Sequence, residues 1–279
     1  MGDVAVITGG AGGMGLATAK LVGRDHTVVL ADIRADRLET ATSILEPLGV
    51  TAHTVHCDVT DRSAVTELFA RAADLGRIAS VIHTAGVSPS MGPADLIMRT
   101  NALGTANVGE VFFDGAREGA AVVNVASMAA HLLPDEVMPA HHFPLALTDP
   151  GGFLAEMATA CGIAPEEARP GYAYAVSKGF VRWYSTAQSE RFGARGLRIL
   201  SVSPGSVDTE MGRLEAEAGA GAMLADAAVP RWGTPEEMAE LLAFCASDRA
   251  GYLTGTDILN DGGVVASVRE RSHRAAGSR

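Results

Sequence analysis

Short apolar runs rich in β-branched residues alternate with longer amphipathic segments along this chain, and this alternation limits the choice of fold more than any other feature. The apolar runs predict seven buried strands, at residues 4–8, 27–31, 51–56, 78–83, 121–126, 198–202 and 256–259. The amphipathic segments predict helices, among them residues 14–22, 35–45, 62–75, 172–192 and 234–245. Helices that alternate with near-continuous apolar strands are typical of a parallel sheet covered on both faces. We therefore expect an α/β fold.

One interval interrupts this alternation between the fifth and the sixth expected strand. Residues 131–170 contain six prolines, the pair His141-His142 and an expected helix over residues 153–161. A segment of about 40 residues buries too little apolar surface to form a core of its own. We interpret it as an insertion into a single domain that spans residues 1–268. The histidine pair is expected in a surface loop and not in a metal site, because no carboxylate or cysteine follows at ligand spacing.

Composition excludes several classes of protein. The net charge of -11 argues against a nucleic-acid surface, which needs clustered lysines and arginines. The basic residues 269–279 are expected to form a solvated, frayed tail. Cys57, Cys161 and Cys245 are too far apart to suggest a disulfide framework or a metal motif. No signal peptide is recognisable, and no run of about 18 apolar residues could span a bilayer. We expect a soluble, cytoplasmic protein without a metal, nucleic-acid or membrane partner.

A glycine-rich turn joins the first expected strand to the first expected helix. The segment Thr8-Gly9-Gly10-Ala11-Gly12-Gly13-Met14-Gly15 places Gly9, Gly13, Met14 and Gly15 at this junction. Glycines allow a tight turn and a close backbone approach to a pyrophosphate, while the helix N-terminus offers free N–H groups and a partial positive charge. The position of the turn predicts a dinucleotide-binding site.

The second expected strand is followed at once by Asp32, 23 residues after Gly9. A carboxylate at this position can accept hydrogen bonds from an adenosine ribose and repels a 2′-phosphate. The next residue, Ile33, is apolar, and Arg34 is interpreted as a solvated side chain. These residues favour NAD over NADP.

A tyrosine and a lysine one helical turn apart form a candidate acid–base pair. Tyr174 and Lys178 share one helix face, and an ammonium near a phenol is expected to lower the phenol pKa. Tyr172 is the rival tyrosine, but Val176 occupies the position where its lysine would be.

These motifs, in this order, resemble the short-chain dehydrogenase/reductase family over residues 4 to about 265. The likeness rests on TGxxxGxG at residues 8–15 and YxxxK at residues 174–178. His83-Thr84-Ala85-Gly86 is similar to the family's Asn-Asn-Ala-Gly segment and differs from it at the first two residues. The remaining positions that match functional residues of the family are Asp58, Val59, Asn101, Ser127, Pro204, Gly205, Val207 and Thr209.

The resemblance implies a Rossmann-type sheet of order 3-2-1-4-5-6-7 with ligands at its carboxyl edge. It implies an NAD-dependent oxidoreductase in which Tyr174 exchanges a proton with the oxygen of a secondary alcohol or ketone and Ser127 hydrogen-bonds that oxygen. Lys178 would lower the tyrosine pKa and hold the nicotinamide ribose. Asn101 would kink its helix and hold a water. Related enzymes are dimers or homotetramers built on the long helices that carry Asn101 and Tyr174.

Two variable segments are expected to decide the substrate. The insertion, with Ala130-His131-Leu132 and Pro144-Leu145-Ala146-Leu147, resembles bacterial 3α-hydroxysteroid dehydrogenase/carbonyl reductases, which suggests a steroid or another bulky alicyclic substrate. It could be a lid or an oligomer contact. Its apolar residues could line a pocket or could pack the insertion onto the body: Leu132, Leu133, Met138, Phe143, Leu145, Leu147, Phe153, Leu154 and Met157.

The second variable segment, residues 210–228, is where this family places a mobile substrate flap. Met211, Leu214, Met223 and Leu224 are the candidates to close over the substrate. Two alternatives remain open at this point, because a fold does not fix a function. The chain could be a non-catalytic NAD-binding regulator, or an oligomeric interaction protein on the same fold.

Overall fold

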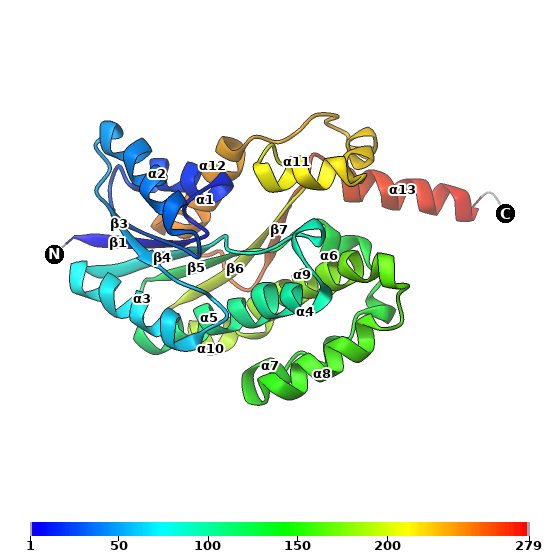
Figure 1. Cartoon of the computed structure of the whole chain (residues 1–279), viewed down its shortest axis with the longest axis horizontal. Coiled ribbons are helices and arrows are strands. Elements are labelled where there is room, and N and C mark those ends of the chain that lie inside the picture. The colour runs from blue at the N-terminus through cyan, green and yellow to red at the C-terminus, as the bar shows by residue number, and fades with distance from the viewer. Residues whose placement is uncertain (1, 278–279) are drawn as a thin grey trace.

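The computed structural model describes residues 2–277 and contains one seven-stranded sheet (Figure 1). All strand pairs are parallel, and the order is β3-β2-β1-β4-β5-β6-β7. The strands are β1 (Asp3–Thr8), β2 (Thr27–Asp32), β3 (Ala52–His56), β4 (Arg77–His83), β5 (Ala121–Val125), β6 (Arg198–Pro204) and β7 (Asp257–Asn260). The expected fold class and strand order are confirmed.

Helices cover both faces of the sheet (Figure 1). One face carries α1 (Gly13–Val22), α2 (Ala35–Leu45) and α12 (Pro235–Ala246). The other carries α3 (Arg62–Leu75), α5 (Gly104–Gly115) and α9 (Arg169–Ala187). In β1, Val4 and Val6 join the core on the α3 side, whereas Ala5 and Ile7 join the core on the α1 side. Because successive side chains point to opposite faces, burial of both faces requires an uninterrupted apolar run.

Shorter helices fill the connections. The remaining α-helices are α4 (Ala94–Ile97), α6 (Ala129–Leu132), α7 (Leu145–Thr148), α8 (Pro150–Cys161), α10 (Ser189–Gly193), α11 (Glu210–Glu217) and α13 (Val264–Gly277). A π-helical segment, η3 (Met98–Leu103), joins α4 to α5. The 3-10 helices are η1 (Glu46–Leu48), η2 (Pro89–Met91), η4 (Asp135–Val137), η5 (Ala140–His142), η6 (Glu166–Ala168), η7 (Ala220–Asp226) and η8 (Asp248–Ala250). The histidine pair thus lies in η5 and not in a loop.

Two expected boundaries are wrong. The helix expected over residues 172–192 is divided at Gln188, beside which the Ser189 hydroxyl donates to the Thr186 carbonyl at 2.7 Å. Such side-chain bonds to the backbone compete with helix continuation. The tail expected to be frayed is instead helical as far as Gly277, while residues 278–279 lie outside the described part.

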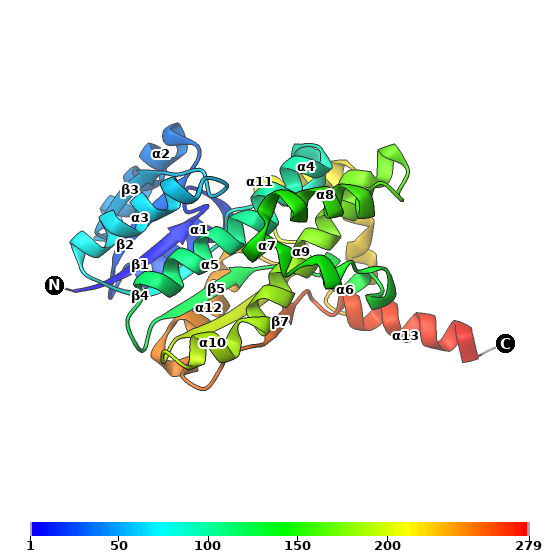
Figure 2. The same ribbon diagram turned by 90° about the horizontal axis from the view of Figure 1, so that it is seen from below.

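The helix α13 projects from the body, and two arginines hold its base (Figures 1 and 2). Arg271 pairs with Asp226 at 2.6 Å, and Arg269 donates to the His131 carbonyl at 3.2 Å. Within residues 2–277, no helix combines the length and the hydropathy that a membrane span requires.

The insertion packs against the α9 side of the body, where α7 and α8 lie beside α9 and α4 (Figure 2). Pro150 starts α8, and the Asp149 carboxylate accepts a hydrogen bond from the Gly152 N–H at 3.0 Å as its N-cap. Phe153 and Met157 are fully buried in the core that includes α9. The insertion therefore extends the main core, as expected for a segment without a core of its own.

Candidate active site

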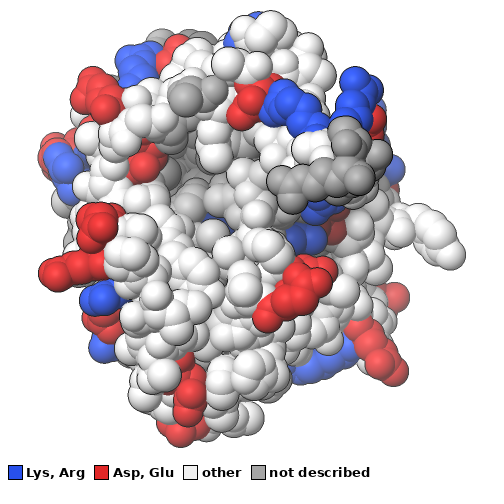
Figure 3. All heavy atoms as spheres, turned by 90° about the vertical axis from the view of Figure 1, so that its right-hand side faces the viewer, with Lys and Arg blue, Asp and Glu red and all other residues white. Residues whose placement is uncertain are grey.

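A large cavity opens at the carboxyl edge of the sheet. Its volume is about 1040 Å³, and the segments that follow β1, β2, β3, β4, β5 and β6 all contribute to its walls. Figure 3 looks onto this edge and shows the molecule hollowed near the centre of that face. Ligand sites of open parallel sheets lie at this edge. We call this space the main cavity.

The glycine turn forms one end of the main cavity. Gly9 and Gly13 have φ of 65° and 49°, in the left-handed region that favours glycine. A Cβ on Gly9 would lie 2.7 Å from the Ala85 nitrogen, so glycine also allows close packing against the segment after β4. Gly15 does not line the cavity. It packs behind the turn, where a Cβ would lie 2.4 Å from the Gly9 oxygen.

The N-terminus of α1 faces this end of the cavity without a side-chain cap. Gly12, the N-cap residue, makes no capping bond, and the first turn of α1 carries no acidic residue. Gly13 and Met14 both line the cavity. Free N–H groups and the positive end of a helix dipole fit the pyrophosphate of a dinucleotide.

The cavity continues past Asp32, at the end of β2. The Asp32 carboxylate accepts hydrogen bonds from the Arg34 N–H at 3.0 Å and the Ala11 N–H at 3.4 Å. The Arg34 side chain is 55% exposed, as expected for a solvated side chain, and its guanidinium also pairs with Asp36 at 2.7 Å. Ile33 is 58% exposed and lines the wall.

The adjoining wall comes from the segments after β3 and β4. The Asp58 carboxylate accepts from the Thr60 N–H at 2.9 Å, and Val59 and Ala85 lie beside it in the lining. Every residue expected to contact adenosine thus lies on the main cavity.

Ser127, Tyr174 and Lys178 meet at the other end of the cavity, although they come from the end of β5 and from α9. The buried Lys178 ammonium donates to the Val125 carbonyl at 2.8 Å and lies 5.9 Å from the centre of the Tyr174 ring. Burial lowers the pKa of Lys178 to about 8. The tyrosine and the lysine thus share one wall, as their spacing predicted.

The expected lowering of the Tyr174 pKa is wrong for this arrangement. Burial raises the pKa of the phenol, a hydrogen bond with Ser127 opposes that rise, and the Glu215 carboxylate adds to it. Lys178 is not among the causes of this shift, and its ammonium donates to the Val125 carbonyl. A buried phenolate is costly unless a charge or a hydrogen bond stabilises it.

Asn101 lies behind this wall and not on it. It is buried in the π-helical segment η3, where the sequence predicted a kinked helix. Its Oδ1 accepts from the Val87 N–H at 2.9 Å, and its Nδ2 donates to the Val87 carbonyl at 3.0 Å and to Ser177 Oγ at 3.1 Å. A Cβ on Gly86 would lie 3.0 Å from Asn101 Oδ1 and 3.4 Å from Lys178 Nζ. Asn101 therefore holds the Gly86 segment close to the lysine.

The two departures from the family's Asn-Asn-Ala-Gly segment are accommodated by hydrogen bonds. The His83 ring, buried at the end of β4, contacts Thr8 Oγ1 at 2.6 Å and Thr105 Oγ1 at 3.1 Å. Burial lowers its pKa to about 3, so the ring is neutral. Thr84 Oγ1 donates to the Thr8 carbonyl at 2.8 Å. Both residues join β4 to β1 beneath the cavity.

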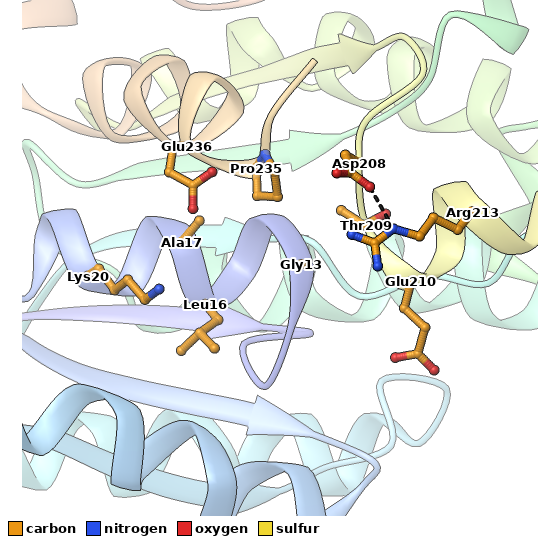
Figure 4. A pocket seen from close by; sticks show the side chains of 10 residues that line it. All are labelled: Gly13, Leu16, Ala17, Lys20, Asp208, Thr209, Glu210, Arg213, Pro235 and Glu236. Carbon is orange, nitrogen blue, oxygen red and sulfur yellow. Dashed lines mark hydrogen bonds and ion pairs between the residues drawn. The ribbon is translucent and has the colours of Figure 1, made fainter. Parts of the chain in front are cut away.

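The segment after β6 closes a further side of the main cavity. Pro204, Gly205, Val207 and Thr209 all line it, as expected. Thr209 also starts α11, because its Oγ1 accepts from the Gly212 N–H at 3.0 Å. A smaller hollow of about 230 Å³ lies between α1, α11 and α12, and there Arg213 turns toward Asp208 at 2.6 Å (Figure 4). This pair fixes the start of the flap.

The segment expected to be a flap forms part of the cavity wall, with two of its four expected residues. Met211 and Met223 line the main cavity, whereas Leu214 is 40% exposed and Leu224 does not line it. The flap also contributes Glu215, which the sequence analysis missed. Its spacing of four residues from Met211 could have indicated a shared helix face.

Other residues that line the main cavity belong to no recognised sequence motif. Met91, Leu96, Arg99 and Trp232 are among them. An Arg37–Glu210 ion pair of 2.6 Å crosses from α2 to α11 beside the glycine turn. No local pattern identifies such contacts, because they join segments that are far apart in the sequence.

The insertion contributes none of its nine expected apolar residues to the lining. Phe143, Phe153 and Met157 belong to the main core. The other six pack against core clusters: Leu132, Leu133, Met138, Leu145, Leu147 and Leu154. The alternative that these residues pack the insertion onto the body is therefore confirmed, because each belongs to a core cluster or packs against one.

The sheet, the uncapped helix N-terminus and the Ser127–Tyr174–Lys178 wall together define a dinucleotide-dependent class of oxidoreductase. Residues 3–140 match the family model described as short chain dehydrogenase, and residues 144–265 match the model described as Enoyl-(Acyl carrier protein) reductase. The chain is 31% identical to a short-chain dehydrogenase/reductase of Alternaria brassicicola, over 92% of this chain and 94% of the relative. It belongs to the short-chain dehydrogenase/reductase family, whose members oxidise alcohols or reduce ketones with a nicotinamide cofactor.

Two further similarities agree with this assignment. Gluconate 5-dehydrogenase of Gluconobacter oxydans is 30% identical, over 96% of each chain. A solved short-chain dehydrogenase/reductase from Serratia marcescens superposes with a TM-score of 0.76 at 23% identity, covering 95% of this chain and 98% of the other. The second likeness shows a shared fold.

Proposed function

We propose that this protein interconverts a secondary alcohol and a ketone with NAD as hydride carrier and Tyr174 as general acid and base. The observation that carries the proposal is the single cavity shared by Ser127, Tyr174 and Lys178 at one end and Asp32 at the other. A nicotinamide bound there would accept or donate hydride. The side chains of this chain orient the substrate and handle its proton.

Each catalytic residue has one task in this proposal. Tyr174 takes the proton of the alcohol in oxidation and returns it in reduction. Ser127 donates a hydrogen bond to the substrate oxygen, where negative charge develops. Lys178 holds the ribose hydroxyls next to the nicotinamide. Asn101 positions the lysine through the Gly86 segment and holds the water that links Lys178 to solvent.

The cofactor preference rests on the end of β2. Asp32 would accept hydrogen bonds from the adenosine ribose and repel a 2′-phosphate, while Arg34 is occupied by Asp36. We infer a preference for NAD. Replacement Asp32→Ala should lower the NAD/NADP ratio of kcat/KM by roughly 10-fold or more, because one repulsive charge is worth about 1–2 kcal/mol near a protein surface. An unchanged ratio contradicts the assignment of Asp32.

The substrate is proposed to be a bulky alicyclic compound, with steroids within that class. The support lies in the apolar wall near the flap, which is formed by Met91, Leu96, Met211, Met223 and Trp232. The insertion does not supply this wall. A cytoplasmic homo-oligomer, a dimer or tetramer built on α5 and α9, is part of the same proposal.

The test follows NADH absorbance with a panel of steroid, alicyclic, aromatic and sugar alcohols, and with the matching ketones. Replacement Tyr174→Phe should reduce turnover by about 10³-fold or more, because the proton path is lost. NAD binding, measured by calorimetry, should remain nearly unchanged. The matched control is Tyr172→Phe, since the Tyr172 hydroxyl donates to the Val137 carbonyl at 2.9 Å away from the cavity.

Two outcomes would contradict the proposal. Substantial turnover by the Tyr174→Phe variant would remove the tyrosine from its role. NAD binding without turnover of any compound in the panel would favour the non-catalytic regulator instead.

A further inference from the structure

The cationic side chains on the wall of the main cavity are all engaged in ion pairs or hydrogen bonds, whereas the Glu215 carboxylate has no cationic partner within the described residues. Four cationic side chains line it, and each is already engaged. Arg34, Arg37 and Arg99 form ion pairs with Asp36, Glu210 and Asp95, and the Lys178 ammonium donates to the Val125 carbonyl. The wall thus offers an entering anion no uncommitted arginine.

Glu215 is different, because no cation neutralises it among residues 2–277. Its Oε1 accepts a hydrogen bond from the Ser90 N–H at 2.9 Å. Glu215 lies one turn after Met211 on α11, and both side chains line the main cavity. Ser90 belongs to η2, so this bond joins the flap to the segment that follows β4.

This carboxylate lines the same cavity as Tyr174. Its charge contributes to the raised pKa of the Tyr174 phenol, which places it within electrostatic range of the group that faces the substrate oxygen. The other residues of the wall near the flap are Met91, Leu96, Met211 and Trp232, together with Arg99, which is paired with Asp95 at 2.7 Å. A substrate here meets a largely apolar wall, one paired arginine and the unpaired charge of Glu215.

We propose that Glu215 is a specificity-determining residue that restricts the substrate to uncharged or cationic alcohols and ketones and excludes carboxylates. This inference rests on the proposed function and narrows its substrate class. Two like charges about 6–8 Å apart at the edge of a protein repel enough to lower binding roughly 10- to 100-fold. Gluconate, the anion in the name of one relative, is therefore a poor candidate substrate for this chain.

The experiment compares a carboxylate with its uncharged methyl ester, which carries one additional methyl group. The full chain is assayed with NAD and either 4-hydroxycyclohexanecarboxylate or its methyl ester. Wild type should favour the ester by about 10-fold or more in kcat/KM, with the difference mainly in KM. Replacement Glu215→Gln should remove most of this preference, and Glu215→Lys should reverse it. Glu217→Gln is the matched control, because Glu217 lies on the same helix, is exposed and does not line the cavity.

A second readout separates charge from a merely structural effect. Loss of the Glu215 charge should shift the pH profile of turnover to lower pH, because one cause of the raised Tyr174 pKa is removed. The Glu217→Gln profile should match that of wild type.

Binding is measured independently of turnover. Trp232 lines the cavity, so quenching of tryptophan fluorescence reports the binding of cyclohexanecarboxylate and of its methyl ester to the NAD complex. Tighter binding of the ester by wild type, lost in Glu215→Gln, supports the inference. Equal binding of acid and ester by wild type, or a preference that survives in Glu215→Gln, overturns it. Absence of turnover with every alcohol would overturn the proposed function and leave this binding result interpretable.

Discussion

The insertion and the flap are both variable segments that could have shaped the substrate site, and they differ in where their apolar side chains lie. In the insertion, Phe153 and Met157 are fully buried against the main core. In the flap, α11 has no buried residue, and Met211 lines the cavity. One segment therefore contributes to the stability of the body, and the other contributes to the cavity wall.

The difference follows from what each helix packs against. The helix α8 lies on α9, α4 and η3, which offer apolar surface continuous with the core. The helix α11 lies over the cavity and is held mainly by polar contacts at its edges, such as Arg37–Glu210 and the bond from Ser90 to Glu215. Apolar side chains that face a packed helix are buried, whereas those that face a cavity remain free to contact a ligand.

The largest effect expected from this comparison is on stability. Replacement Phe153→Ala should lower the free energy of unfolding by about 3–5 kcal/mol, because it removes a buried ring and leaves a cavity. Leu214→Ala, at a 40% exposed position of α11, should change it by less than about 0.5 kcal/mol. Denaturant unfolding measures both. A change below about 1 kcal/mol in Phe153→Ala would mean that the insertion is not part of the core.

The second-largest difference expected between the insertion and the flap is in the reaction rate of a cysteine thiol placed in each. Burial raises the pKa of Cys161 in α8 to about 11, so at pH 8 its thiolate fraction is roughly 100-fold below that of an exposed thiol with a pKa of about 8.5. A cysteine introduced by Leu214→Cys should therefore react with Ellman's reagent at least about 100-fold faster than Cys161.

The reaction of Cys161 should also accelerate as the pH rises toward 11, because its thiolate fraction increases. Peptide mapping distinguishes it from Cys57 and Cys245, which are buried as well. Comparable rates for Cys161 and the introduced cysteine would show that the insertion opens readily.

A smaller effect is expected on substrate affinity. Met211→Ala should raise KM for an alicyclic substrate by about 5- to 10-fold, because part of one apolar side chain leaves the contact. Leu154→Ala in the insertion should leave KM unchanged, since Leu154 packs against the core and does not line the cavity. Steady-state kinetics test both variants, and a reversed pattern would assign the substrate wall to the insertion.

The smallest effect should come from the polar contact that holds the flap. The Arg37–Glu210 pair is exposed, and such pairs are weak and screened by salt. Arg37→Ala should raise KM for NAD by about two- to threefold at low salt and by less at high salt. An effect above about 10-fold would mean that Arg37 contacts the cofactor directly.

Much of the cofactor end could be predicted from the sequence, because its residues follow strand ends. Gly9 and Asp32 are far apart in the chain, but parallel strands bring their carboxyl ends to one edge. Asp58 and Ala85, at the same edge, were supplied by the resemblance to the family. Tyr174 and Lys178 were singled out by their i,i+4 spacing, which places both on one helix face.

The substrate end could not be predicted in this way. Glu215 reaches its place through a hydrogen bond with Ser90, 125 residues away, and no local pattern encodes that contact. The direction of the Tyr174 pKa shift was also predicted wrongly, because burial, the Ser127 hydrogen bond and the Glu215 charge set it and Lys178 is not among its causes.

By itself, the sequence determined the α/β class, the glycine turn and the tyrosine–lysine pair, because each depends on short-range periodicity and on the rule that parallel strands share an edge. The resemblance to a family supplied the strand order and the position of Ser127. Only the tertiary structure decided which apolar segment was buried and which faced the cavity. Burial and electrostatics at one point depend on every neighbouring element, and those neighbours are distant in the chain.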